Sequence, residues 1–112
     1  MDITREYWCL NPMEIRKKIT EKTKAIIVVQ LYGHPAKIDE ILEIANDYNL
    51  YVIEDCAEAQ GAEFKGKKVG TMGHISCFSL YGNKIITTAG GGVIATNEDE
   101  IAEKCEIIKN YG

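Results

Sequence analysis

The stretch Leu50-Tyr51-Val52-Ile53-Glu54-Asp55 decides the fold. An apolar run of this length is typical of a buried strand, and this one ends in two adjacent carboxylates. A second apolar run, Ile75-Ser76-Cys77-Phe78, ends in the hydroxyl of Ser79, and Lys84 follows five residues later beside Gly82 and Asn83. We therefore expect two strands that carry polar side chains at, or just beyond, their carboxyl ends.

Helical and strand-like patterns alternate on either side of these two runs. Residues 25–30 form a continuous β-branched run, which predicts a strand covered on both faces. Residues 38–45 have apolar side chains at helical spacing, and residues 91–96 predict a further strand entered through glycines. This alternation predicts an α/β fold with a mostly parallel sheet and flanking helices. Because chemistry in such folds gathers beyond the carboxyl ends of the strands, one pocket would contain Glu54, Asp55, Ser79 and Lys84.

Local signals place the helix starts and one hairpin. Asn11 is predicted to cap a helix that runs to about residue 20, with Pro12 at its first position and Glu14 reaching back to the cap. Asn97 is predicted to cap a last helix, whose residues Ile101, Cys105 and Ile108 share one face. Two short runs on either side of residues 65–66 predict a small hairpin or an irregular excursion of the chain.

The composition is that of an ordinary globular domain. The 112 residues are 46% hydrophobic and 27% charged, which fits at most one domain. A net charge of −4 argues against nucleic-acid binding. There is no run of about 20 apolar residues to span a membrane, and the first residues do not resemble a signal peptide. The four cysteines are dispersed, as is typical of free thiols in a reducing compartment, so we expect a cytoplasmic protein without a metal site.

An acid and an amine at neighbouring strand ends are the groups that a pyridoxal phosphate enzyme needs. The acid keeps the ring nitrogen of the cofactor protonated, and the lysine forms a Schiff base with the cofactor. At least one of Glu54 and Asp55 should approach the interior, where an unpaired carboxylate is costly. Simpler interpretations remain open at this point: a strand-end acid paired with a backbone amide or a lysine, a magnesium ligand, and for Lys84 a surface loop position.

Two further features are weaker when each is taken alone. Ser79 and the backbone amides after it would hold a phosphate, although most serines at strand ends only satisfy local backbone. The glycines in Ala89-Gly90-Gly91-Gly92 allow a close approach of backbone to a cofactor, or simply a tight turn. They lack the spacing of a dinucleotide-binding motif. His34 and His74 receive no catalytic role.

The order of several motifs carries a family resemblance. They are Leu31-Tyr32-Gly33-His34-Pro35-Ala36, Glu54-Asp55-Cys56-Ala57-Glu58-Ala59, Gly66-Lys67-Lys68-Val69-Gly70, Phe78-Ser79 and Gly82-Asn83-Lys84. In this order they resemble the DegT/DnrJ/StrS sugar aminotransferases, pyridoxal phosphate enzymes of the aspartate aminotransferase fold. Perosamine-synthase-like members are the most similar. The resemblance runs through practically all 112 residues.

The resemblance implies a role for each candidate residue. Lys84 would be the Schiff-base lysine and would shuttle a proton between the substrate and the cofactor. Asp55 would pair with the pyridine nitrogen, Glu58 would lie near the cofactor's 3-hydroxyl, and Ser79 would bind the phosphate. The implied reaction transfers an amino group, typically from glutamate, to a keto group of a nucleotide-linked deoxysugar for polysaccharide or related sugar biosynthesis, in a homodimeric enzyme. A sister branch of dehydratases has His in place of this lysine.

The sequence departs from the family in two respects. Members usually have Gly-Glu-Gly-Gly where this chain has Ala89-Gly90-Gly91-Gly92. Members are also much longer, so we expect residues 1–112 to be a partial large domain that binds pyridoxal phosphate, without the small C-terminal domain, and to have little or no transaminase activity in isolation. The alternative is an inactive truncated remnant or an interaction module of the same fold. A nucleotide- or metal-binding α/β module is a third possibility.

Overall fold

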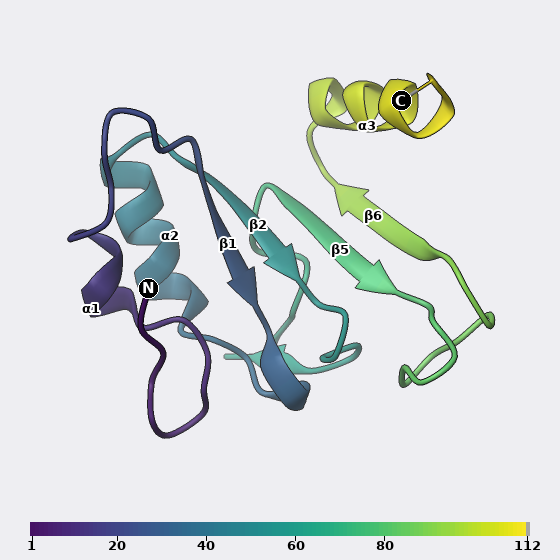
Figure 1. Cartoon of the computed structure of the whole chain (residues 1–112), viewed down its shortest axis with the longest axis horizontal. Helices are drawn as coiled ribbons and strands as arrows, with labels where there is room; N and C mark the ends of the chain where they lie inside the picture. The colour runs from purple at the N-terminus through teal and green to yellow at the C-terminus, as the bar shows by residue number, and fades with distance from the viewer. Residues whose placement is uncertain (112) are drawn as a thin grey trace.

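A four-stranded sheet organises the protein, which a computed structural model describes over residues 1–111. Its strands lie in the order β1 (Ala25–Val29), β2 (Tyr51–Asp55), β5 (Ile75–Ser79) and β6 (Gly92–Thr96). The first three are parallel, and β6 runs antiparallel to β5. Figure 1 shows the carboxyl ends of β1, β2 and β5 pointing the same way. The predicted α/β fold with a mostly parallel sheet is confirmed.

Two helices cover one face of this sheet. The apolar stripe of α2 (Ile38–Asp47) packs against alternate residues of β1 and β2, including Val28 and Val52, which are fully buried. The short helix α1 (Pro12–Ile15) adds Ile15 to the same core. Burial of alternate strand residues on a single face follows from the period-2 geometry of a strand.

The opposite face of the sheet lies open, which corrects the expectation for residues 25–30. Ile27 is 62% exposed and Val29 is 40% exposed, whereas their neighbours Ile26 and Val28 are buried. The reason is that α1 and α2 both pack on the side of Ile26 and Val28, so within residues 1–111 no helix covers Ile27 and Val29. We call this surface the open face.

The predicted start of the first helix is confirmed, whereas its end and the start of the last helix need correction. Asn11 does cap α1, because its side chain accepts a hydrogen bond from the Met13 amide, but the helix ends at Ile15. Glu14 pairs with Lys17 instead of reaching back, since the amide of Asn11 already donates to the carbonyl of Asp2. The last helix, α3, spans Asp99–Tyr111 and therefore begins two residues after its predicted cap.

The connections between the strands include the hairpin predicted around residues 65–66. After β1, the 3₁₀ turn η1 (Leu31–Gly33) leads toward α2. Between β2 and β5, the hairpin of β3 (Glu63–Phe64) and β4 (Lys67–Lys68) turns at Lys65 and Gly66, both of which have positive φ. This is the two-residue turn that the sequence predicted. None of the helices within residues 1–111 is both long and apolar enough to cross a membrane.

Candidate functional site

Three segments meet beyond the carboxyl ends of the parallel strands. They are η1 after β1, residues 56–62 after β2, and residues 80–91 between β5 and β6 (Figure 1). Contacts among them bring Glu58 against Lys84 and against the backbone of Tyr32. Such an edge is where open α/β sheets carry their binding sites.

The two carboxylates at the end of β2 point to opposite faces of the sheet. Glu54 is fully buried and its carboxylate accepts four hydrogen bonds. Asp55 follows on the open face and is half-buried. Its Oδ1 accepts a hydrogen bond of 3.1 Å from the Ala57 amide, and within residues 1–111 its Oδ2 accepts none. One acid therefore approaches the interior, as expected, and the other keeps an oxygen available on the open face.

Glu54 is held by donors from two directions. Its Oε2 accepts from Gln30 Nε2 at 3.0 Å and from the Gly70 amide at 2.8 Å. Its Oε1 accepts from the amides of Met72 and Gly73 at 2.9 and 2.7 Å. A carboxylate with this many donors is satisfied within the fold. We therefore assign Glu54 to the scaffold that fixes the connection between β2 and β5.

Lys84 is the one residue of segment 81–91 that is not exposed. Its side chain is 19% exposed, and its Nζ lies 3.5 Å from Oε1 of Glu58, whose side chain is 35% exposed. The other oxygen of Glu58 accepts from the Tyr32 amide at 3.3 Å. The structure thus places the predicted lysine and the predicted acid in contact, on two different segments of the site.

Ser79 lies at the end of β5 on the same face as Asp55. Asp55 pairs with Cys77 across the two strands, and Ser79 follows Cys77 by two residues. The Oγ of Ser79 accepts a hydrogen bond of 3.3 Å from the Tyr81 amide. Because that contact uses Oγ only as an acceptor, its hydrogen remains free to be donated to a ligand.

Sequence reasoning missed the role of Gln60. Its Nε2 donates to the carbonyl of Ser79 at 2.6 Å, and its Oε1 accepts from the Ile86 amide at 2.9 Å. An amide side chain two residues after Glu58 carries no local signal for such a bridge, because its partners are distant in sequence. Glu54 was noticed in the sequence, but its partners were not.

The thiol of Cys56 is an inert neighbour of the site. Burial raises the pKa of the Cys56 thiol to about 12, with smaller contributions from the negative charges of Glu54 and Asp55. At neutral pH this cysteine is therefore protonated and a poor nucleophile. It belongs to the small apolar cluster formed with Ala59 and Val69.

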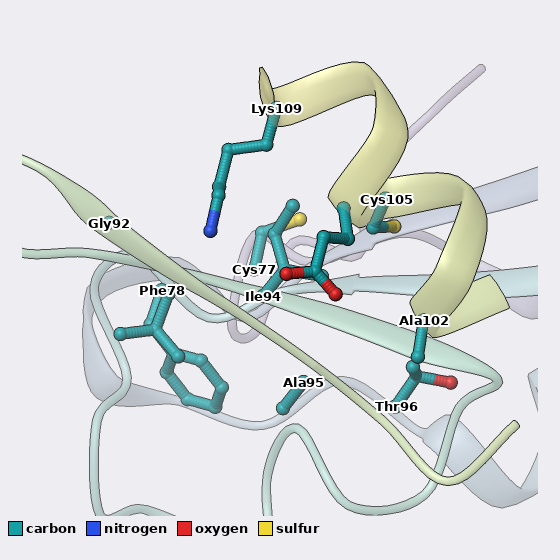
Figure 2. Close-up of a pocket in the computed structure, with 11 residues that line it drawn as sticks. Cys77, Phe78, Gly92, Ile94, Ala95, Thr96, Ala102, Cys105 and Lys109 are labelled. Carbon is teal, nitrogen blue, oxygen red and sulfur yellow. The ribbon is translucent and has the colours of Figure 1, made fainter. Parts of the chain in front are cut away.

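A groove beside α3 lies away from this strand edge. It has a volume of about 820 Å³ and separates α3 from β5 and β6. Figure 2 shows Ala102, Cys105 and Lys109 of α3 on one side, with residues of β5 and β6 on the other. None of Asp55, Glu58, Ser79 and Lys84 lines it. The candidate site is an open strand-end surface, and we assign it by its chemistry and not by cavity size.

The groups at this surface fit pyridoxal phosphate. That cofactor has a basic ring nitrogen, an aldehyde and a phosphate. The free oxygen of Asp55 suits the first, the largely buried amine of Lys84 suits the second, and the hydroxyl of Ser79 suits the third.

Comparison with known proteins points to a single family. The model of the DegT/DnrJ/EryC1/StrS aminotransferase family matches residues 1–112. The GDP-perosamine synthase of Escherichia coli O157:H7 is 50% identical over 112 residues, which are 100% of this chain and 31% of that synthase. The chain spans less than a third of the length of the curated relatives it matches.

Solved structures agree with this assignment. The aminotransferase from Psychrobacter cryohalolentis superposes with a TM-score of 0.94 at 42% identity, over 99% of this chain and 28% of that one. A GDP-4-keto-6-deoxymannose-3-dehydratase, solved with a trapped PLP-glutamate geminal diamine, gives 0.88 at 32% identity, over 100% of this chain and 31% of that one. The predicted fold class is thereby confirmed. The chain belongs to the DegT/DnrJ/EryC1/StrS aminotransferase family.

Proposed function

We propose that this chain forms the cofactor-binding core of a pyridoxal-phosphate-dependent sugar aminotransferase. The observation that carries the proposal is the placement of Lys84, largely buried against Glu58, at the strand edge where Asp55 presents a free carboxylate oxygen. A lysine kept from solvent is typical of a site that binds a carbonyl cofactor.

Each candidate residue has a task that its surroundings support. Asp55 would hold a proton on the ring nitrogen through its free oxygen, and Ser79 would donate its hydroxyl hydrogen to the phosphate. Glu58 would orient Lys84 through their 3.5 Å contact and lie near the 3-hydroxyl. Lys84 would hold the cofactor and then move a proton at the substrate carbon through its Nζ. When bound, pyridoxal phosphate supplies a ring that withdraws electrons from that carbon.

The substrates follow from the relatives and not from this chain alone. GDP-perosamine synthase is a sugar-nucleotide enzyme by name, and one structural neighbour was solved with glutamate joined to the cofactor. We propose that glutamate gives its amino group to a keto group of a nucleotide-linked deoxysugar, in a pathway of polysaccharide or related sugar synthesis. The proposed compartment is the cytoplasm.

The proposal extends to the organisation of the enzyme. Because the chain spans 31% of the perosamine synthase, we propose that residues 1–112 correspond to part of its large, cofactor-binding domain. We propose a homodimer for the complete enzyme. An inactive remnant of the same fold is the competing interpretation, favoured by Gly90, which stands where an acidic residue is usual.

Cofactor binding at Lys84 tests the proposal. Titration with pyridoxal phosphate should produce a visible absorbance band, and reduction with borohydride should fix the cofactor on Lys84, as mass spectrometry would locate it. Lys84→Ala should abolish both signals. Lys104→Ala, which changes an exposed lysine of α3, should preserve them.

The same assay separates the two interpretations. A band in the parent protein that persists in Lys84→Ala would contradict the assigned role of the lysine. Absence of any band in the parent would favour the remnant. In the complete enzyme, incubation with glutamate and a nucleotide-linked ketosugar should give the amino sugar, whereas a deoxygenated product without nitrogen would indicate a dehydratase.

A further inference from the structure

The side chain of Gln60 bridges two segments of the candidate site. Its Nε2 donates to the Ser79 carbonyl at 2.6 Å, and its Oε1 accepts from the Ile86 amide at 2.9 Å. The first partner ends β5, and the second lies two residues beyond Lys84. Gln60 itself is half-buried and lies in the segment after β2. Its side chain therefore joins that segment to the backbone on both sides of Lys84, at Ser79 and at Ile86.

The turn depends on this contact because little else holds it from outside. Within residues 1–111, the hydrogen bonds that tie segment 81–91 to the end of β2 come from Glu58 and Gln60. Its other hydrogen bonds are internal or go to Ser79 and Leu80 at the end of β5. Glu58 contacts the Lys84 amine, and Gln60, two residues later, accepts from the Ile86 amide, so both contacts join the same two segments.

The two contacts differ in strength and in dependence on salt. The Glu58–Lys84 pair is long, at 3.5 Å, and partly exposed, so it is screened and contributes little alone. The Gln60 bonds are shorter and do not involve charge. The bridge also needs one donor and one acceptor in a single side chain, which an amide provides and an ionised carboxylate does not.

We propose that Gln60 is a positioning residue that holds the turn around Lys84 against the end of β5, so that the amine stays shielded and aimed at the cofactor. The role of Lys84 itself rests on the proposed function above. The shielding part of the inference does not, because it concerns contacts that exist without any ligand.

Three variants of the full chain test this role. Gln60→Ala removes both hydrogen bonds. Gln60→Glu keeps the shape but places an oxygen against the Ser79 carbonyl, and it regains a donor when its carboxyl is protonated near pH 4. Asn110→Asp is the matched control, because it makes the same amide-to-carboxylate change on the exposed surface of α3.

The first measurement uses the cofactor-free protein. We expect the Ile86 amide to exchange its hydrogen roughly two- to tenfold faster in Gln60→Ala, as loss of one hydrogen bond implies. Lys84 should react several-fold faster with trinitrobenzenesulfonate, while the exposed Lys109 is unchanged. In Gln60→Glu the ionised carboxylate is repelled by the Ser79 carbonyl and should move away from it, so that the Ile86 amide loses its acceptor and its protection at pH 7. Protection should return near pH 4, a rescue that a general loss of structure would not show.

The second measurement uses pyridoxal phosphate fixed by borohydride. Capture at Lys84 should fall several-fold in Gln60→Ala, so that reagent labelling rises while cofactor capture falls. Unchanged Ile86 exchange in Gln60→Ala would overturn the bridge. Faster exchange with unchanged labelling and capture would reduce Gln60 to a structural residue. If the parent protein captures no cofactor, the proposed function fails, and the labelling ratio still decides whether Gln60 shields Lys84.

Discussion

Glu54 and Asp55 carry the same functional group one residue apart, and the sheet sends them into opposite surroundings. Glu54 lies in the interior, where Gln30 and three backbone amides donate to it. Asp55 lies on the open face with one local hydrogen bond and a free oxygen. The face of the sheet, and not the identity of the side chain, therefore separates a structural acid from one that is available for chemistry.

The difference also shows how the site is supported. The donors to Glu54 include the amides of Gly70, Met72 and Gly73. Its carboxylate therefore holds in place the last residues of the connection that leads into β5. Asp55 then projects from a strand whose neighbour is fixed in register by that connection. A satisfied buried acid thus positions its unsatisfied neighbour, and each can be changed separately.

The largest effect should come from breaking the buried half of the pair. Glu54→Ala leaves the buried Gln30 amide and three part-buried backbone amides without their acceptor, so we expect the free energy of unfolding to fall by about 3 kcal/mol or more. Urea unfolding measures this loss. Glu103→Ala, an exposed glutamate of α3, is the control and should change stability by less than about 0.5 kcal/mol. Equal losses in the two variants would contradict the scaffold role.

The open-face acid should show the reverse behaviour. Asp55→Asn keeps the local contact with Ala57 within reach and removes the charge, so stability should change by less than about 1 kcal/mol. In the enzyme, amino transfer should fall by roughly 100-fold, because the ring nitrogen loses its anionic partner. Initial rates with glutamate and a nucleotide-linked ketosugar measure this. A loss of stability as large as that of Glu54→Ala would remove the contrast between the two acids.

The pKa of the Cys56 thiol depends on both carboxylates, because each of their charges raises it in addition to burial. Its pKa of about 12, against the ordinary 9.0, means that only the unfolded chain loses this proton between those values. Stability should therefore decline as the pH rises from 9 toward 12, and Cys56→Ala should remove that part of the decline. Urea unfolding at several pH values tests the sign.

The pKa of Cys56 can also show which of the two carboxylates acts on it more strongly. Glu54 contributes more than Asp55 to the raised pKa of Cys56. Alkylation rates of Cys56 across pH should thus reveal a larger decrease of its pKa in Glu54→Gln than in Asp55→Asn. The opposite order would mean that the charge of Asp55 acts on the Cys56 thiol more strongly than the charge of Glu54 does.

The smallest effects concern the two loops that the carboxylates border. The first loop, residues 70–73, donates its amides to Glu54. It has a glycine where a larger residue would clash, since a Cβ on Gly70 would lie 2.4 Å from the Phe78 ring. The second loop, segment 81–91, instead has Ala89 at a φ of 69°, a conformation that glycine adopts more easily. Ala89→Gly should raise the free energy of unfolding by up to about 1 kcal/mol in a denaturant titration.

Gly90→Glu is the matched change in the next residue. A Cβ on Gly90 would meet nothing within 4 Å, so this substitution should leave stability within about 0.5 kcal/mol. It restores the acidic residue usual in the family, and its effect on catalysis can then be measured free of a folding defect. A loss of stability greater than that of an ordinary surface substitution would show that the loop has a tighter environment.

The strands that bear the site were predictable because their signals are local. The run at residues 75–79 became β5, and the run that ends in Glu54 and Asp55 became β2. The covering of β1 was not predictable, because a β-branched run does not reveal how many helices are present to cover it. The end of α1 was missed for a similar reason: an Asn-Pro start predicts where a helix begins but not how long it continues.

Within the site, residue types were easier to predict than their contacts. The sequence indicated that at least one of Glu54 and Asp55 would be buried, and the structure shows that it is Glu54. Which one turns inward depends on which face the helices cover. The Glu58–Lys84 contact and the Gln60 bridge depend on loop paths between distant residues, for which no periodic pattern exists. The cofactor roles of Asp55, Glu58, Ser79 and Lys84 stay predictions.

The direct pairing of β2 with β5 has a consequence for local unfolding. Every candidate residue belongs to one of these two strands or to the segment that follows it, and none belongs to α3. Helix α3 has no fully buried residue and rests against β6. It should therefore open and close at a low free-energy cost while the β2–β5 unit stays intact. Native-state hydrogen exchange should separate the chain into a fast helix at the C-terminal side and a slow unit that contains the candidate site.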